Sequence, residues 1–208
     1  LAGIDIGDGG GGTDEAIAIM RSRDFTNNFI VEENILPILF KDKWDDNNNS
    51  WKNKKDLPSL WDAYKIFNPV RKVHKDKKTG LVTVAIEWTD PKQAADWVSK
   101  IIYRINNQLR QQAVIDAEKS IQYLQSELLK TSVIEVKQSI YKMVEAQTKN
   151  KMLANTQQEY AFRVIDKAVV PEERIKPRRR NITIIGFVLG VLIAGFIIAY
   201  RCFKPADK

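Results

Sequence analysis

The side chains that most often carry chemistry are scarce and scattered in this sequence of 208 residues. His74 is the only histidine, and it stands among lysines with no second histidine or cysteine nearby to complete a metal site. Cys202 is the only cysteine, so no intramolecular disulfide can form. Acidic residues and lysines are plentiful, but they fall at ordinary spacings in polar segments. We therefore predict a protein that is not an enzyme, with no catalytic residue, no cofactor and no metal.

Residues 1–12, LAGIDIGDGGGG, end in four consecutive glycines, and such a loop can cradle a phosphate through its backbone N–H groups. A P-loop, however, needs Gly-Lys-Ser or Gly-Lys-Thr where a helix opens. Here Thr13, Asp14 and Glu15 follow, and two carboxylates would repel a phosphate. We interpret residues 1–12 as a Gly-rich leader before an N-capped helix.

Trp44 and Trp51 lie in the polar loop KDKWDDNNNSWKNKKDLP, residues 41–58. Tryptophans in such surroundings can stack on sugar rings, which makes this pair a candidate glycan contact. They can equally serve as hydrophobic pins that hold a long loop to the body of the protein.

The basic charge is concentrated near the C-terminus. Residues 171–208 carry eight Lys/Arg and three Asp/Glu, whereas the rest of the chain is close to neutral. This location suits contact with lipid phosphates. Zinc-finger spacings and a concentrated basic recognition helix are both missing from the sequence, so we expect no nucleic-acid partner.

The basic residues near the C-terminus flank a run of 20 residues without a charge, Asn181 to Tyr200. As a helix it would span about 30 Å, the hydrocarbon thickness of a bilayer. We predict a transmembrane helix over 181–203, with membrane lipid as a partner and a short tail at 204–208. A Pro/Arg-rich spacer, residues 171–180, precedes it, and its membrane-flank residues are Pro171, Pro177, Arg178, Arg179 and Arg180.

Small residues recur four apart inside that run, at Gly186, Gly190 and Ala194. Such a seam allows another transmembrane helix to approach closely, so we predict a packing site there. A plain apolar anchor with incidental glycines is the alternative.

A long helix is predicted to begin at Asp90-Pro91, because aspartate caps a helix and proline fits its first position. Apolar residues recur every three or four positions as far as residue 128, a stripe that must be buried against a partner helix. The predicted oligomer or helix-packing stripe comprises Val98, Ile101, Ile105, Leu109, Ile121, Leu124 and Leu128.

The apolar pattern ends at residues 130–132. Ser132 and Glu135, three residues apart, have the spacing of a capping box. A second helix would then continue to residue 157, giving a long helical excursion over 91–157. One unbroken helix is the alternative.

Two paired strands are predicted at 69–75 and 81–88, with Val82, Val84 and Ile86 on one apolar face. Residues 158–170 alternate in the same way and predict a returning strand that needs that sheet. The sequence therefore predicts an α/β (α+β) membrane-proximal domain. Its N-terminal part is residues 13–90, and a long protruding helical hairpin and a C-terminal transmembrane helix complete the fold.

Several segments carry a resemblance to a known family. EYAFRVIDKAVVPEERIKPRRR followed by GFVLGVL, and LVTVAIEWTDPKQAADW, resemble the bacterial polysaccharide co-polymerases, the Wzz-type chain-length determinants. LAGIDIGDGGGG with SRDF, and LWDAYKIFNPVRKV, resemble members that act on lipopolysaccharide O-antigen. The resemblance implies a ring-like homo-oligomer in the bacterial inner membrane that regulates the length of a glycan built by a separate O-antigen polymerase, with direct contact to the growing glycan left open.

The resemblance also implies that most of the chain is periplasmic and that the C-terminus is cytoplasmic. Charge counting on the two flanks of residues 181–203 points the opposite way. We expect a first transmembrane helix upstream of Leu1 to set the orientation. Relatives that carry a tyrosine-kinase domain, such as Etk-like proteins, have a Walker motif that this sequence lacks. A membrane adaptor or tyrosine-kinase modulator of capsule or exopolysaccharide export is the alternative function.

Overall fold

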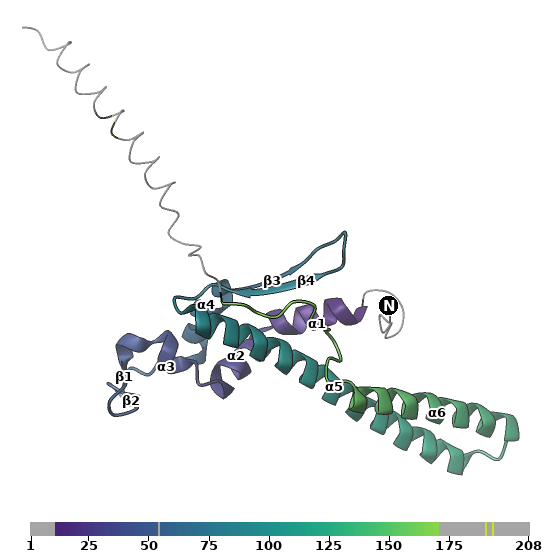
Figure 1. Cartoon of the computed structure of the whole chain (residues 1–208). Coiled ribbons are helices and arrows are strands. Elements are labelled where there is room, and N and C mark those ends of the chain that lie inside the picture. Colours follow the sequence, from purple (N-terminus) through teal and green to yellow (C-terminus); the bar gives the residue numbers. More distant parts are fainter. Residues whose placement is uncertain (1–10, 54, 171–189, 191–192, 194–208) are drawn as a thin grey trace, which may run out of the picture. The chain divides into compact units, whose positions relative to one another are not determined.

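The structure is a computed structural model, shown in Figure 1, and it describes residues 11–53, 55–170, 190 and 193. The chain divides into two compact units, residues 1–170 and residues 171–208. Of the second unit, Gly190 and Ile193 are described, and both are helical. Every helix and strand with defined bounds belongs to the first unit.

Three helices open the first unit: α1 (Gly11–Arg21), α2 (Arg23–Glu32) and α3 (Leu36–Leu39). Ser22 separates the first two, because its hydroxyl accepts the backbone N–H of Phe25 at 3.1 Å and caps α2. Asn34 turns the chain after α2 in a left-handed conformation, φ 49°, which asparagine tolerates better than most residues. A 3₁₀ turn (Lys41–Lys43) and a minimal hairpin of β1 (Trp44–Asp45) and β2 (Ser50–Trp51) follow.

Ser59 and Asp62 form a capping box that starts α4 (Leu60–Val70). The chain continues directly into β3 (Arg71–Lys75), which pairs antiparallel with β4 (Val82–Ile86) so that Arg71 lies opposite Ile86. Gly80 has φ 71° in the connecting turn, a conformation that glycine adopts without a steric penalty. The predicted strand pair is confirmed, although the first strand begins at Arg71 because Pro69 and Val70 belong to α4. Val82, Val84 and Ile86 pack against the core.

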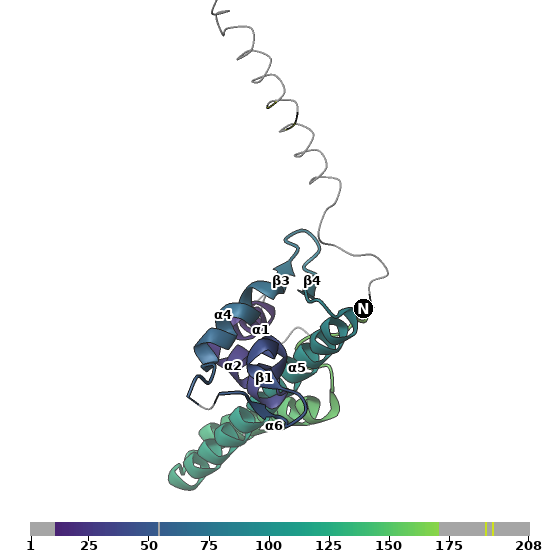
Figure 2. The ribbon, with the colours of Figure 1, turned by 90° about the vertical axis from the view of Figure 1, so that its left-hand side faces the viewer.

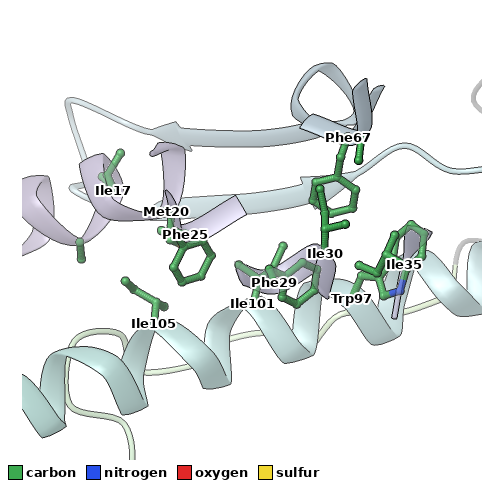
Figure 3. Packing of buried hydrophobic residues seen from close by; sticks show 12 residues of the cluster. Ile17, Met20, Phe25, Phe29, Ile30, Ile35, Phe67, Trp97, Ile101 and Ile105 are labelled. Carbon is green, nitrogen blue, oxygen red and sulfur yellow. The ribbon is translucent and has the colours of Figure 1, made fainter. Parts of the chain in front are cut away.

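The core lies where α1, α2, α4 and the first half of α5 (Pro91–Lys130) meet (Figure 3). Aromatic side chains join these helices: the ring centroids of Phe29 and Phe67 are 5.7 Å apart, and those of Phe67 and Trp97 are 5.6 Å apart. The buried cluster consists of Ala16, Ile17, Met20, Phe25, Phe29, Ile30, Ile35, Ala63, Phe67, Trp97, Ile101 and Ile105. This body fixes the base from which the long helices extend.

A long helical hairpin is confirmed, because α6 (Ile134–Thr156) packs back along α5 (Figures 1 and 2). Asp90 caps α5 as predicted, accepting from the backbone N–H of Lys92 at 2.9 Å. The capping box at Ser132 is wrong. The N-cap of α6 is Val133, and no side chain makes a capping hydrogen bond there. A capping box in this helix would need its two residues at positions 133 and 136, and Ser132 and Glu135 each precede these positions by one residue.

The predicted strand over 158–170 is also wrong. In the described part of the chain no strand follows β4, and the sheet of β3 and β4 has two strands. The segment after α6 does return to the body, where Ala161 and Phe162 pack against the core. Its backbone groups at these residues bond to the side chain of Asn106 instead of to a neighbouring strand. The first unit is therefore a mixed α/β domain with a long helical hairpin.

Candidate functional site

The apolar stripe of α5 has two successive partners inside the chain. Ile101 and Ile105 are fully buried in the core of the body, and Leu109 packs against that core. Val98 is buried as well. Farther along, Leu124 is buried in the part of α5 where Figure 1 shows α6 alongside, and Ile121 and Leu128 are half-buried. The stripe positions the hairpin within one copy of the chain, so these seven side chains are not an open surface.

The hairpin is closed by small and medium-sized apolar residues. Ala117 and Leu124 on α5, and Ile140 and Ala154 on α6, are all buried. Lys151 on α6 pairs with Glu118 on α5, with 2.8 Å between the ammonium and carboxylate groups. Because this pair is largely exposed, it adds little to stability, and apolar packing holds the two helices together.

A second, sparser apolar stripe on α6, with the polar residues Glu145 and Thr148 between its second and third members, has no partner in the described part of the chain. Ile134, Tyr141 and Met152 are 68%, 61% and 63% exposed. At roughly 100° per residue, these positions lie within about 20° of one another around the helix. They face away from the buried Ile140 and Ala154. The sequence analysis missed this stripe, although the spacings of seven and eleven residues were visible, because the α5 pattern is longer and more regular.

Asn106 fastens the segment that follows α6 to the first half of α5. Its Oδ1 accepts the backbone N–H groups of Ala161 and Phe162, both at 2.7 Å, and its Nδ2 donates to the Phe162 carbonyl at 2.9 Å. Asn106 is 3% exposed. Asn106 therefore joins the segment that follows the hairpin to the part of α5 that packs in the core of the body.

Ion pairs fix α2 against α5 at the base of the hairpin. Arg104 binds both carboxylate oxygens of Glu32, one of them at 2.7 Å through Nη2, and Lys100 pairs with Glu33 at 2.7 Å. The hydrogen bond that Arg104 donates to Glu32 lowers the pKa of Glu32, and the hydrogen bond that Lys100 donates to Glu33 raises the pKa of Lys100. These groups hold helices together, and their arrangement does not resemble an acid–base pair.

Trp44 and Trp51 lie opposite each other in the β1–β2 hairpin. Their rings meet edge to face, with centroids 4.9 Å apart and an interplanar angle of 79°. Both side chains are half-buried. The two rings therefore contact each other, and neither belongs to the buried core cluster. They do not hold the loop to the body as hydrophobic pins would. The sugar-contact interpretation stays open.

In the part of the chain that the structure describes, no group of three or more His, Cys, Asp or Glu is placed to hold a metal ion. His74 is exposed on β3. The absence of catalytic residues, cofactor and metal stays a prediction.

Most of the predicted membrane segment lies outside the described residues. This holds for Pro171, Pro177, Arg178, Arg179, Arg180, Gly186 and Ala194, whereas Gly190 is described as helical and exposed. Over residues 11–53 and 55–170, together with Gly190 and Ile193, no helix has the length and apolar character needed to cross a membrane.

One protein-family model matches the chain, over residues 123–203, and is described as GNVR, a G-rich domain on putative tyrosine kinase. This domain is found in Wzz/Etk-type polysaccharide chain length determinants and in tyrosine kinase adaptors. The match begins in the last third of α5 and takes in α6 and the segment fastened by Asn106. It suggests a role in polysaccharide chain length or export. No curated protein matches the chain.

Proposed function

We propose that this chain regulates polysaccharide chain length in the biosynthesis of lipopolysaccharide O-antigen, as a non-catalytic oligomeric scaffold beside a separate polymerase. One observation carries the proposal: the match to a domain of chain-length determinants takes in all of α6, the helix that carries the unpartnered apolar stripe. The resemblance of segments outside the match, such as LVTVAIEWTDPKQAADW, supports the same function.

The proposal places the protein in the bacterial inner membrane through residues 181–203, with the bulk of the chain in the periplasm and the C-terminus in the cytoplasm. The charge-free run from Asn181 to Tyr200 and its arginine flank support an anchor there. In this arrangement the hairpin presents α6 to neighbouring molecules in the periplasm.

Assembly into a ring-like homo-oligomer would use the α6 stripe of Ile134, Tyr141 and Met152. Three large apolar side chains on one exposed helix face are costly in water and gain free energy when a second copy covers them. The α5 stripe is less suited to this role, because the chain itself buries four of its seven side chains and half-buries the other three.

Length control can then follow by two routes. The oligomer can hold polymerase copies at a fixed stoichiometry, or it can also bind the growing glycan, with Trp44 and Trp51 as candidate contacts. Glycan binding tested on an intact oligomer separates the two routes.

The direct test of the function is deletion of the gene followed by gel display of surface polysaccharide. We expect polymer still to be made but without a preferred length, and re-expression of the full chain to restore that length. An unchanged band pattern in the deletion strain would contradict the proposal, and so would complete loss of polymer, which would indicate a role in synthesis itself.

A second candidate is a membrane adaptor or tyrosine-kinase modulator of capsule or exopolysaccharide export. The description of the matched model, which places the domain on a putative tyrosine kinase, favours it. In the same deletion strain this function predicts altered tyrosine phosphorylation and reduced capsule export with the O-antigen pattern unchanged.

A further inference from the structure

A hollow of about 420 Å³ opens on the body where the end of α1, the last turns of α4 and the start of β3 come together. These are elements that Figure 1 shows side by side. The described residues that form its wall are Arg21, Tyr64, Asn68, Arg71, Lys72 and Val73, and none of them is acidic.

Arg71 is the buried cation of this wall. It is 7% exposed, and its guanidinium donates to the Thr26 hydroxyl at 2.7 Å and to the Asn68 side-chain oxygen at 3.1 Å. Both acceptors are neutral, and a guanidinium has five N–H donors, so part of its capacity is unused. Among the residues that the structure describes, no carboxylate pairs with Arg71.

Arg21 supplies a second cation at the same place. It is exposed, and its guanidinium donates to the backbone carbonyl of Val73, the second residue after Arg71. Burial lowers the pKa of Arg71, the Tyr64 hydroxyl opposes this shift, and the charge of Arg21 lowers the pKa further. The third cation of the wall, Lys72, forms an ion pair with Glu87. The positive charges of the wall that remain without an ion-pair partner among the described residues are therefore those of Arg21 and Arg71.

A desolvated guanidinium without a counter-ion is costly, and a like charge beside it adds to the cost. An oxyanion between the two groups would remove both penalties at once. Arginine forks match the oxygen geometry of phosphate, and the negative charge of a phosphate, up to two for a monoester, opposes the positive charge of the two guanidiniums. Tyr64 and Asn68 add hydrogen-bonding groups beside this position.

We propose that this hollow is a binding site for a phosphate-bearing ligand, held between the guanidinium groups of Arg21 and Arg71. Its volume exceeds that of a phosphate alone, so it has space for an attached group such as a sugar or glycerol. The inference does not rest on the proposed function.

Binding is tested on the full chain by titration with inorganic phosphate at constant ionic strength, followed through the backbone amide NMR signals of Arg21, Asn68 and Arg71. We expect saturable shifts of these signals. Substitution Arg21→Gln removes one charged donor pair from an exposed position and is expected to weaken binding about tenfold. Arg71→Met should abolish binding, but its bond to Thr26 also supports the fold, so Arg21→Gln is the decisive variant.

The matched control is Arg163→Gln, which removes the same charge from an exposed residue outside the hollow. It should bind phosphate as the unchanged chain does. The proposal is overturned if these amide signals do not respond to phosphate, or if Arg163→Gln weakens binding as much as Arg21→Gln, since that result would mean a general effect of net charge.

Two further probes identify the source of the phosphate. A soluble sugar phosphate that shifts the signals more strongly than inorganic phosphate indicates a sugar-phosphate ligand. Phosphatidylglycerol vesicles that shift them, when phosphatidylcholine vesicles do not and Arg21→Gln removes the effect, indicate a lipid headgroup. Either result supports the site.

Discussion

The side chain of Asn106 bonds to both backbone groups of Phe162, a residue 56 positions later in the chain. Oδ1 accepts the Phe162 N–H at 2.7 Å, and Nδ2 donates to the Phe162 carbonyl at 2.9 Å. The first half of α5 and the segment that leaves α6 are thereby fixed together. One buried amide replaces the bonds that a neighbouring strand would have offered.

Substitution Asn106→Ala should therefore destabilise the fold strongly. It leaves the N–H groups of Ala161 and Phe162 and one carbonyl without partners beside the core, a loss of about 3 kcal/mol in the free energy of unfolding. Denaturant unfolding of the full chain measures this change. Asn150→Ala is the control, because Asn150 is exposed on α6 and should cost less than about 0.5 kcal/mol. Equal effects of the two substitutions would contradict the role given to Asn106.

Substitution Tyr141→Lys should weaken self-association without unfolding the protein. It places a charge in the middle of the α6 stripe, where the proposed neighbouring copy would have to desolvate it. Asn150→Lys adds the same charge roughly 160° around the helix from Ile134 and should leave assembly unchanged. Sedimentation velocity measures the oligomer in both. An oligomer as stable in Tyr141→Lys as in the unchanged chain would show that copies meet through another surface.

Asp62 should titrate far below an ordinary aspartate. The hydrogen bond from the Ser59 hydroxyl, with a smaller contribution from Lys65, lowers its pKa from 3.8 to about 2. The stability that this carboxylate contributes is fully present above pH 3.8 and is lost as the pH falls through about 2. NMR titration of the Asp62 carboxyl carbon measures the pKa. In Ser59→Ala it should return toward 3.8, and an unchanged low value would mean that the cap is not its cause.

The Trp44–Trp51 pair tests whether the β1–β2 hairpin contacts glycan. Trp51→Ala removes the edge-to-face contact, worth about 1 kcal/mol, and the candidate sugar surface together. Because neither ring belongs to the core cluster, the free energy of global unfolding should change little. We expect weaker binding of purified O-antigen fragments by an intact oligomer, measured by calorimetry. Unchanged binding would favour control through polymerase stoichiometry alone.

Local signals in the sequence were sufficient for the elements with clear start and stop residues. Asp90-Pro91 marked the beginning of α5, and the alternation of Val82, Val84 and Ile86 marked β4. The cap of α5 lies within a few residues, and β4 pairs with the strand that directly precedes it in the sequence, so both signals are local.

Apart from the capping box at Ser132, which is wrong by one residue of local register, the errors concern interactions between distant residues. Tyr160, Phe162 and Val164 alternate like a strand, but the deciding partner is Asn106, and no local pattern shows that an asparagine on α5 will meet this segment. The change of partner along the α5 stripe could not be predicted for the same reason. Ile105 and Leu124 occupy equivalent positions in the same three- and four-residue pattern, but Ile105 lies in the core of the body and Leu124 does not. The juxtaposition of Arg21 and Arg71 likewise depends on tertiary packing.

The central claim is that an assembled, non-catalytic scaffold sets polysaccharide length through the outer face of α6. The most direct measurement is the length distribution of surface polysaccharide in a deletion strain that expresses, at equal levels, the unchanged chain or a variant with Ile134→Lys, Tyr141→Lys and Met152→Lys. The account predicts a restored preferred length with the first, and polymer without a preferred length with the second. A normal preferred length from a variant shown to be monomeric would contradict it.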